Sequence, residues 1–262
     1  MIQYLFCAHT DTGRVRANNE DAVVFDAEMA VGVLADGMGG YNAGEVASGM
    51  ATDFIKTELS KWLSEAGPLA QLAHLKRAME LCVHKANLAI YNSALDNPHH
   101  AGMGTTLVLG VFLGDTLLLG HIGDSRCYRV RKGHCERLTR DHSYLQEQMD
   151  AGLMTPLQAA CSPHRYLVTR ALGVEDAVLL ELGQHRVEPN DVYLMCSDGL
   201  SDMLADAEML EVLQNVASHP EKAASLVDLA NAKGGRDNIS VLLVHASGEP
   251  DKRGLISRLL GK

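Results

Sequence analysis

Acidic residues recur in this chain of 262 residues at short turns that follow apolar segments. Two of these segments are unusually apolar: residues 31–35 come directly before Asp36, and residues 192–197 come directly before Asp198. A carboxylate at the end of a buried strand is costly to desolvate unless a cation or a hydrogen-bond donor compensates it. A single Asp-Gly pair has an ordinary explanation, because it is a common turn sequence.

The pattern carries more weight because it is repeated five times. The acidic turns are Asn19-Glu20-Asp21, Asp36-Gly37, Gly123-Asp124, Ser197-Asp198-Gly199 and Asp237-Asn238. Carboxylates that converge repel one another, and metal ions are the natural remedy. A ligand set made only of oxygen, without nearby thiolate or imidazole, favours Mg²⁺ or Mn²⁺ over Zn²⁺. These turns therefore indicate a site for divalent cations.

Taken in order, the motifs of this chain resemble those of the bacterial protein phosphatase 2C family. They are Gly13-x-x-Arg16-x-Asn18-Asn19-Glu20-Asp21, Asp36-Gly37-Met38-Gly39-Gly40, Gly104-Thr105-Thr106, Gly123-Asp124-Ser125-Arg126, Thr169-Arg170-Ala171-Leu172-Gly173, Ser197-Asp198-Gly199-Leu200 and Asp237-Asn238. The resemblance spans nearly the whole chain. It implies a serine/threonine phosphatase in which two divalent cations, Mn²⁺ or Mg²⁺, activate a water molecule. That water attacks phosphorus in line, without a covalent enzyme intermediate.

The resemblance also assigns roles to individual residues. Asp36 would bridge both cations, and Gly37 would offer its carbonyl oxygen. Asp198 and Asp237 would complete the ligand set of the first cation. Glu20 would support the second cation, directly or through water.

Two further roles and one departure follow from the same motifs. Bacterial members often hold a third, weaker cation, which would use Asp124 together with Asp198. The arginine that binds the substrate phosphate corresponds to Arg16, whereas Arg14 does not fit the motif spacing. Met38 stands where eukaryotic relatives carry a histidine that could protonate the leaving oxygen, so the acid is unassigned. Three histidines near the motifs are expected to be packing or surface residues: His9, His121 and His142.

Two alternative functions fit part of this pattern. Phosphatases with an aspartyl nucleophile need a second acid two residues after the nucleophile, but Met38 occupies that position after Asp36. A catalytically inactive regulatory domain that binds phosphoproteins would typically have lost metal-binding acids, whereas this chain keeps them. Hydrolysis of a generic phosphate ester with Mn²⁺ would separate the enzyme from the inactive domain.

The composition narrows the class of protein and its partners. The formal net charge of −10 gives no basic face of the kind that nucleic-acid binding requires. The chain shows no signal peptide and no apolar stretch long enough for a membrane span. Its six cysteines lack zinc-type spacing and suit a reducing compartment. We expect a cytoplasmic monomer that acts on phosphorylated Ser/Thr proteins and, by resemblance, opposes a cognate kinase.

The elements that must position the motifs are strands and paired helices. Alternation and turn residues predict strands at residues 2–9, 22–35 (broken near Asp26–Ala27, as in a hairpin), 105–113, 116–122, 127–131, 187–196 and 238–245. Helical spacing of apolar residues predicts helices at 44–65, 68–95, 207–216 and 221–232. Two antiparallel sheets stacked face to face, each flanked by a pair of helices, would bury every apolar stripe.

The predicted fold is therefore an α+β, four-layer α-β-β-α sandwich. We expect residues 1–246 to form one phosphatase catalytic domain. Within it, residues 141–165 are polar and weakly periodic, which indicates a partly helical flap. Residues 247–262 would form a C-terminal tail.

Overall fold

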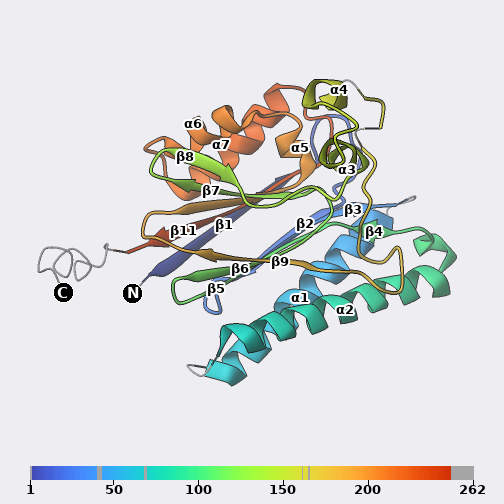
Figure 1. Cartoon of the computed structure of the whole chain (residues 1–262), viewed down its shortest axis with the longest axis horizontal. Helices are drawn as coiled ribbons and strands as arrows, with labels where there is room; N and C mark the ends of the chain where they lie inside the picture. The colour runs from blue at the N-terminus through green and yellow to red at the C-terminus, as the bar shows by residue number, and fades with distance from the viewer. Residues whose placement is uncertain (1, 40–42, 68–69, 161, 165, 249–262) are drawn as a thin grey trace, which may run out of the picture.

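The computed structural model describes residues 2–39, 43–67, 70–160, 162–164 and 166–248, and these residues form two antiparallel sheets stacked face to face (Figure 1). The first sheet has the strand order β1-β11-β10-β7-β8 and the second has the order β2-β3-β5-β6-β9, with β4 paired to β3. In the first sheet the bounds are β1 Gln3–Asp11, β7 Arg126–Arg131, β8 His134–Arg137, β10 Val192–Cys196 and β11 Ile239–Ser247. In the second they are β2 Asp21–Asp26, β3 Val31–Met38, β4 Gly104–Thr105, β5 Leu107–Leu113, β6 Thr116–Ile122 and β9 Glu181–Arg186.

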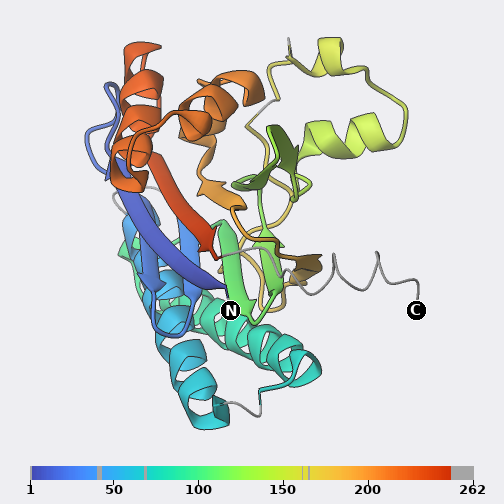
Figure 2. The same cartoon turned by 90° about the vertical axis from the view of Figure 1, so that its left-hand side faces the viewer.

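Helices cover the outer face of each sheet. The long helices α1 (Ala43–Ala66) and α2 (Leu72–Asp96) pack on the second sheet, and α6 (Asp206–Gln214) and α7 (His219–Ala232) pack on the first (Figures 1 and 2). The remaining helical segments are η2 (Pro98–His100), α3 (Tyr144–Asp150), α4 (Pro156–Ala160) and α5 (Asp198–Ser201). The predicted four-layer α-β-β-α sandwich is confirmed.

Three apolar layers hold the sandwich together, and strand β10 shows how one strand serves two of them. Its residues Val192 and Leu194 pack toward α6 and α7, whereas Tyr193 and Met195 pack between the two sheets. Because side chains alternate across a strand, both faces of β10 are apolar and all five of its residues are buried. The continuous apolar run in the sequence has this origin.

One predicted element is wrong. The strand expected at residues 187–196 begins only at Val192, because residues 187–191 turn, with Asn190 in the left-handed region at φ 71°. The strand that precedes this turn, β9, was not predicted. It lies at the edge of the second sheet, and its largely exposed sequence ELGQHR gives little apolar alternation.

The segment predicted as a flap contains the short helices α3 and α4, which stand away from the sheets in Figure 2. Its first three residues, Asp141 to Ser143, are buried and tie it to the sandwich. Strand β11 continues to Ser247, which pairs with Gln3, one residue beyond the predicted domain end. Gly40 and most of the predicted tail, residues 249–262, lie outside the described residues. Among the described helices, none has the length and apolar character needed to cross a membrane.

Candidate active site

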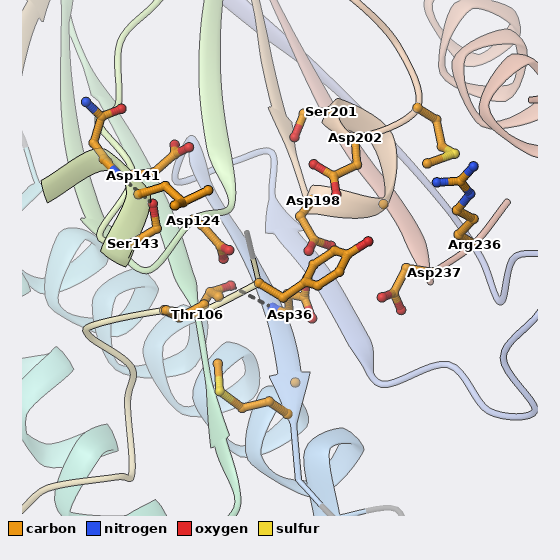
Figure 3. Close-up of a pocket in the computed structure, with 18 of the residues that line it drawn as sticks. Asp36, Thr106, Asp124, Asp141, Ser143, Asp198, Ser201, Asp202, Arg236 and Asp237 are labelled. Atoms are coloured by element: carbon orange, nitrogen blue, oxygen red, sulfur yellow. Dashed lines mark hydrogen bonds between the residues drawn. The ribbon is translucent and has the colours of Figure 1, made fainter. Parts of the chain in front are cut away.

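A cavity of about 840 Å³ lies where β3 and β10 end and β11 begins. All seven residues that the sequence nominated line it: Arg16, Glu20, Asp36, Gly37, Asp124, Asp198 and Asp237. Figure 3 shows the carboxylates of Asp36, Asp198 and Asp237 reaching the same space from different strands and loops. Asp36 belongs to the second sheet, whereas Asp198 and Asp237 adjoin strands of the first, so the two sheets build the site together.

The Gly-Thr-Thr motif fixes the backbone of Asp36. The Asp36 amide N–H donates to Thr106 Oγ1 at 2.9 Å, and the Thr106 amide N–H donates to the Asp36 carbonyl oxygen at 2.9 Å. Thr105 Oγ1 donates to the same carbonyl oxygen at 2.9 Å. These bonds hold the main chain of Asp36 on both sides while its side chain faces the cavity.

Two glycines let the loops of the site approach closely. A Cβ at Gly37 would overlap the carbonyl oxygens of Gly44 and Glu20, and a Cβ at Gly199 would overlap that of Asn238. Any larger residue at either position would push apart the segments that carry Glu20, Asp198 and Asp237. The glycines of both Asp-Gly motifs are therefore required by packing, whatever ligand role their carbonyls have.

The charge of the cavity is strongly unbalanced. Its lining includes seven acids (Glu20, Asp36, Asp124, Asp141, Asp198, Asp202 and Asp237) against two cationic side chains, Arg16 and Arg236. Burial, followed by the charges of neighbouring aspartates, raises the pKa of Asp36 and of Asp198 well above the ordinary value. Burial and then the charge of Asp141 raise the pKa of Asp124 to about 6.

Asp21, which the sequence reasoning did not nominate, lies behind Asp36. The two residues face each other across β2 and β3, and burial raises the pKa of Asp21 to about 6. Ser197 Oγ donates to Asp21 Oδ2 at 2.7 Å, but the buried Asp21 Oδ1 has no hydrogen-bond partner among the described residues. Buried carboxylates in such numbers, one with an orphaned oxygen, fit hard divalent cations such as Mn²⁺ or Mg²⁺.

Asn238 of the Asp-Asn motif organises the loop that carries Arg16 and Glu20. Its Oδ1 accepts from the Glu20 amide N–H at 2.8 Å, and its Nδ2 donates to the carbonyl oxygens of Thr12 at 3.0 Å and Asn18 at 2.8 Å. Arg16 Nη2 donates to Asp237 Oδ2 at 2.6 Å. The guanidinium is therefore paired with a nominated cation ligand through one N–H group, and half of the Arg16 side chain stays exposed.

The turn that carries Asp124 is held by its neighbours. Ser125 Oγ lies 2.7 Å from Thr106 Oγ1, which links this turn to the backbone of Asp36. Arg126 donates to both carboxylate oxygens of Asp141, at 2.6 Å and 3.0 Å. These contacts hold the chain that follows Asp124, whose side chain lines the cavity.

Three charged lining residues were not nominated as site residues from the sequence: Asp141, Asp202 and Arg236. Asp202 and Arg236 carried a usable signal, because they stand four residues after Asp198 and directly before Asp237. Figure 3 shows Arg236 on the same side of the cavity as Asp202 and Asp237. Met38 also lines the cavity, and its described lining contains no histidine.

Comparisons with known proteins agree with this geometry. Residues 9–232 match the family model described as protein phosphatase 2C. The serine/threonine phosphatase stp of Listeria innocua is 36% identical over 238 residues, which cover 90% of this chain and 93% of that protein. The crystal structure of the Mycobacterium tuberculosis serine/threonine phosphatase PstP/Ppp is 39% identical, with a TM-score of 0.84 over 95% of this chain and 100% of that one. The catalytic domain of PstP in complex with two manganese ions is 37% identical, with a TM-score of 0.82 over 95% and 100% of the two chains.

Proposed function

Since the chain belongs to the protein phosphatase 2C family of metal-dependent serine/threonine phosphatases, we propose that its seven nominated cavity residues hold the cations and the substrate phosphate. The observation that carries the assignment is the convergence of Asp36, Asp198 and Asp237 from both sheets on one cavity. Asp36 would contact both cations, and Gly37 would offer its carbonyl oxygen. Asp198 and Asp237 would hold the first, and Glu20 the second.

The cations, when bound, supply an activated water and positive charge beside the phosphoryl group. The chain supplies the geometry. The Thr105 and Thr106 bonds keep the Asp36 carboxylate in place, so little has to rearrange when a cation arrives. Arg16 would bind phosphate oxygens with N–H groups that Asp237 does not use, and would thereby orient the phosphoryl group for in-line attack.

The acid that protonates the leaving oxygen must be a group that reaches the cavity. Met38 cannot donate a proton, and His121 and His142 are buried outside the lining. Burial raises the pKa of Asp124, another acid of the cavity, to about 6. We assign Asp124 a different role: together with Asp198 it would be a ligand of a third, weaker cation.

Phosphorylated serine and threonine proteins are the substrates, and we propose that a cognate bacterial Ser/Thr kinase supplies them. We further propose that the protein works as a cytoplasmic monomer, with residues 1–246 as the catalytic domain and residues 141–165 as a flap over the cavity. Six cysteines without zinc-type spacing support the cytoplasmic location, and the flap residues Ser143, Leu145 and Met149 in the cavity lining support the flap.

The test of the site is cation binding together with turnover. Asp36→Asn and Asp198→Asn should each abolish hydrolysis of a phosphothreonine peptide and remove tight Mn²⁺ binding in calorimetry, while circular dichroism stays unchanged. Asp53→Asn, an exposed position on α1, is the matched control. Full turnover and Mn²⁺ binding in either site variant would refute the assignment of that residue.

A further inference from the structure

Behind the turn that carries Asp124, two buried imidazoles stack on each other. His121 lies at the end of β6 and His142 at the start of the flap, with ring centroids 4.7 Å apart and planes 30° apart. Glu181 of β9 completes the group. It is the cross-strand partner of His121, and its Oε2 lies 3.0 Å from His142 Nε2.

These three side chains have the composition of a metal site, with candidate ligand atoms within 4.8 Å of one another. Three features argue against that interpretation. His142 Nδ1 accepts from the Gly123 amide N–H at 3.1 Å, so its Nε2 carries the proton and has no lone pair for a cation. The two rings overlap with centroids 4.7 Å apart and a tilt of 30° between their planes, which leaves little room for an ion between them. Arg170 Nη1 adds positive charge 3.5 Å from His142 Nε2.

The same contacts form a chain of hydrogen bonds that runs from Glu181 through His142 to Gly123. Glu181 accepts the proton of His142 Nε2, which fixes the tautomer in which Nδ1 accepts from the Gly123 amide N–H. The His142 amide N–H donates to the Gly123 carbonyl oxygen at 2.8 Å, so the two residues are bonded reciprocally. On the other side of the turn, His121 Nε2 donates to the Ser125 carbonyl oxygen at 3.0 Å.

The neighbours of Asp124 on both sides, Gly123 and Ser125, are thus held by stacked imidazoles. We propose that Glu181 and His142 are positioning residues that hold the Asp124 carboxylate toward Asp198 for the weak third cation. This inference depends on the proposed role of Asp124. His142 also joins this turn to the segment that follows the flap, because the Thr169 amide N–H donates to the His142 carbonyl oxygen at 2.8 Å.

Variants that keep or remove single hydrogen bonds of this chain can test the proposal. In His142→Asn the side-chain oxygen can occupy the place of Nδ1 and still accept from the Gly123 N–H, whereas His142→Gln reaches toward Glu181 and leaves that N–H unpaired. Glu181→Gln keeps an oxygen that accepts from Nε2, and Glu181→Ala does not. Glu181 is a half-exposed side chain, so its variants should fold even if His142→Ala does not.

The first readout needs no turnover. In the cation-free protein, hydrogen exchange of the Gly123 amide should accelerate in His142→Gln and Glu181→Ala, and should stay close to wild type in His142→Asn and Glu181→Gln. Calorimetry should show the weakest Mn²⁺ event losing about tenfold in affinity in the first two variants, the size found when a residue that orients a ligand is removed. The matched control is Glu136→Ala, a glutamate on the edge strand β8 that pairs with Arg129. Unchanged Gly123 exchange in both disruptive variants would overturn the inference.

The second readout is a double-mutant cycle on kcat and KM. Glu181→Ala should lower kcat with little change in KM, and should add nothing in an Asp124→Ala background. A defective Asp124→Ala whose defect adds fully to that of Glu181→Ala would overturn the positioning role and leave the proposed function standing. An Asp124→Ala with normal kcat and Mn²⁺ binding would overturn the ligand role of Asp124 and the inference with it.

Discussion

Replacing Asp124 by asparagine should stabilise the cation-free protein, and it should do so more at neutral than at acidic pH. Asp124 lies among Asp141, Asp198 and Asp202, and without cations its ionised form is poorly solvated. Asparagine keeps the size of the side chain and one acceptor oxygen, and it removes the charge. The variant should therefore lose a third cation site and gain stability when chelator is present.

The magnitude follows from the pKa of Asp124, which burial and then Asp141 raise from 3.8 to about 6. A shift of roughly two units at about 1.4 kcal/mol each makes ionisation in the folded state cost about 3 kcal/mol. Because the folded-state pKa is the higher one, the folded protein binds this proton more tightly than the unfolded chain does. The associated stability is complete below about pH 4 and is lost as the pH rises through about 6.

The assay is urea denaturation of wild type and Asp124→Asn in chelator at several pH values. The difference in unfolding free energy should grow in favour of the variant by about 1.4 kcal/mol between about pH 5 and pH 7.5, which is roughly half of the full effect. Contributions from other acids cancel when the two proteins are compared. Asp198 is an exception, because the charge of Asp124 raises its pKa, and removing that charge makes the difference in unfolding free energy larger. Asp53→Asn serves as control, and a difference that does not vary with pH would refute the reasoning.

Three further substitutions test other contacts of the site. Arg16→Ala should raise KM for a phosphopeptide by the equivalent of ~1.5–3 kcal/mol, the value of a lost charge-assisted hydrogen bond. Mn²⁺ binding should not weaken, because Arg16 competes with cations for Asp237. A defect in Arg14→Ala instead would identify Arg14 as the residue that binds phosphate. Asn238→Ala should lower the unfolding free energy by about 2–3 kcal/mol in urea titrations, since the Glu20 N–H and two carbonyl oxygens lose their partner, and wild-type stability would contradict this. Arg236→Ala should raise KM more for a phosphopeptide with an acidic residue beside the phosphoresidue than for one with a lysine there, because Arg236 is an exposed cation in the cavity lining. Equal changes in KM would exclude that contact.

Site residues could be predicted from the sequence where an acidic residue directly follows an apolar strand. Asp36 and Asp198 follow buried strands, and the structure places both in the cavity. Asp21 was missed although its motif was noted, because its importance depends on which residue faces it across β2 and β3. Register between strands is a property of the folded sheet, and one sequence read along its length does not contain it.

Glu181 shows a different reason for failure. It lies on β9, an edge strand with little buried surface, so the alternation that identifies strands is faint there. Val187, by contrast, is buried although it stands in the turn after β9, and it lengthened the apparent apolar run before β10. The layers were predictable because they depend on long apolar stripes, whereas the partners of His142 depend on single contacts between distant segments.

The pairing of β1 with β11 has a consequence for how the protein acquires its activity. The first strand pairs along its whole length with the last, and β11 lies between β1 and β10 in the sheet. During synthesis the first sheet therefore stays open until β11 has left the ribosome, and Asp237, two residues before that strand, joins the other acids late. Pairing over such a sequence separation is slow, because a long loop must close before its contacts form. Cations that need ligands from both sheets would bind only after this step. They would therefore slow unfolding without changing the rate of folding.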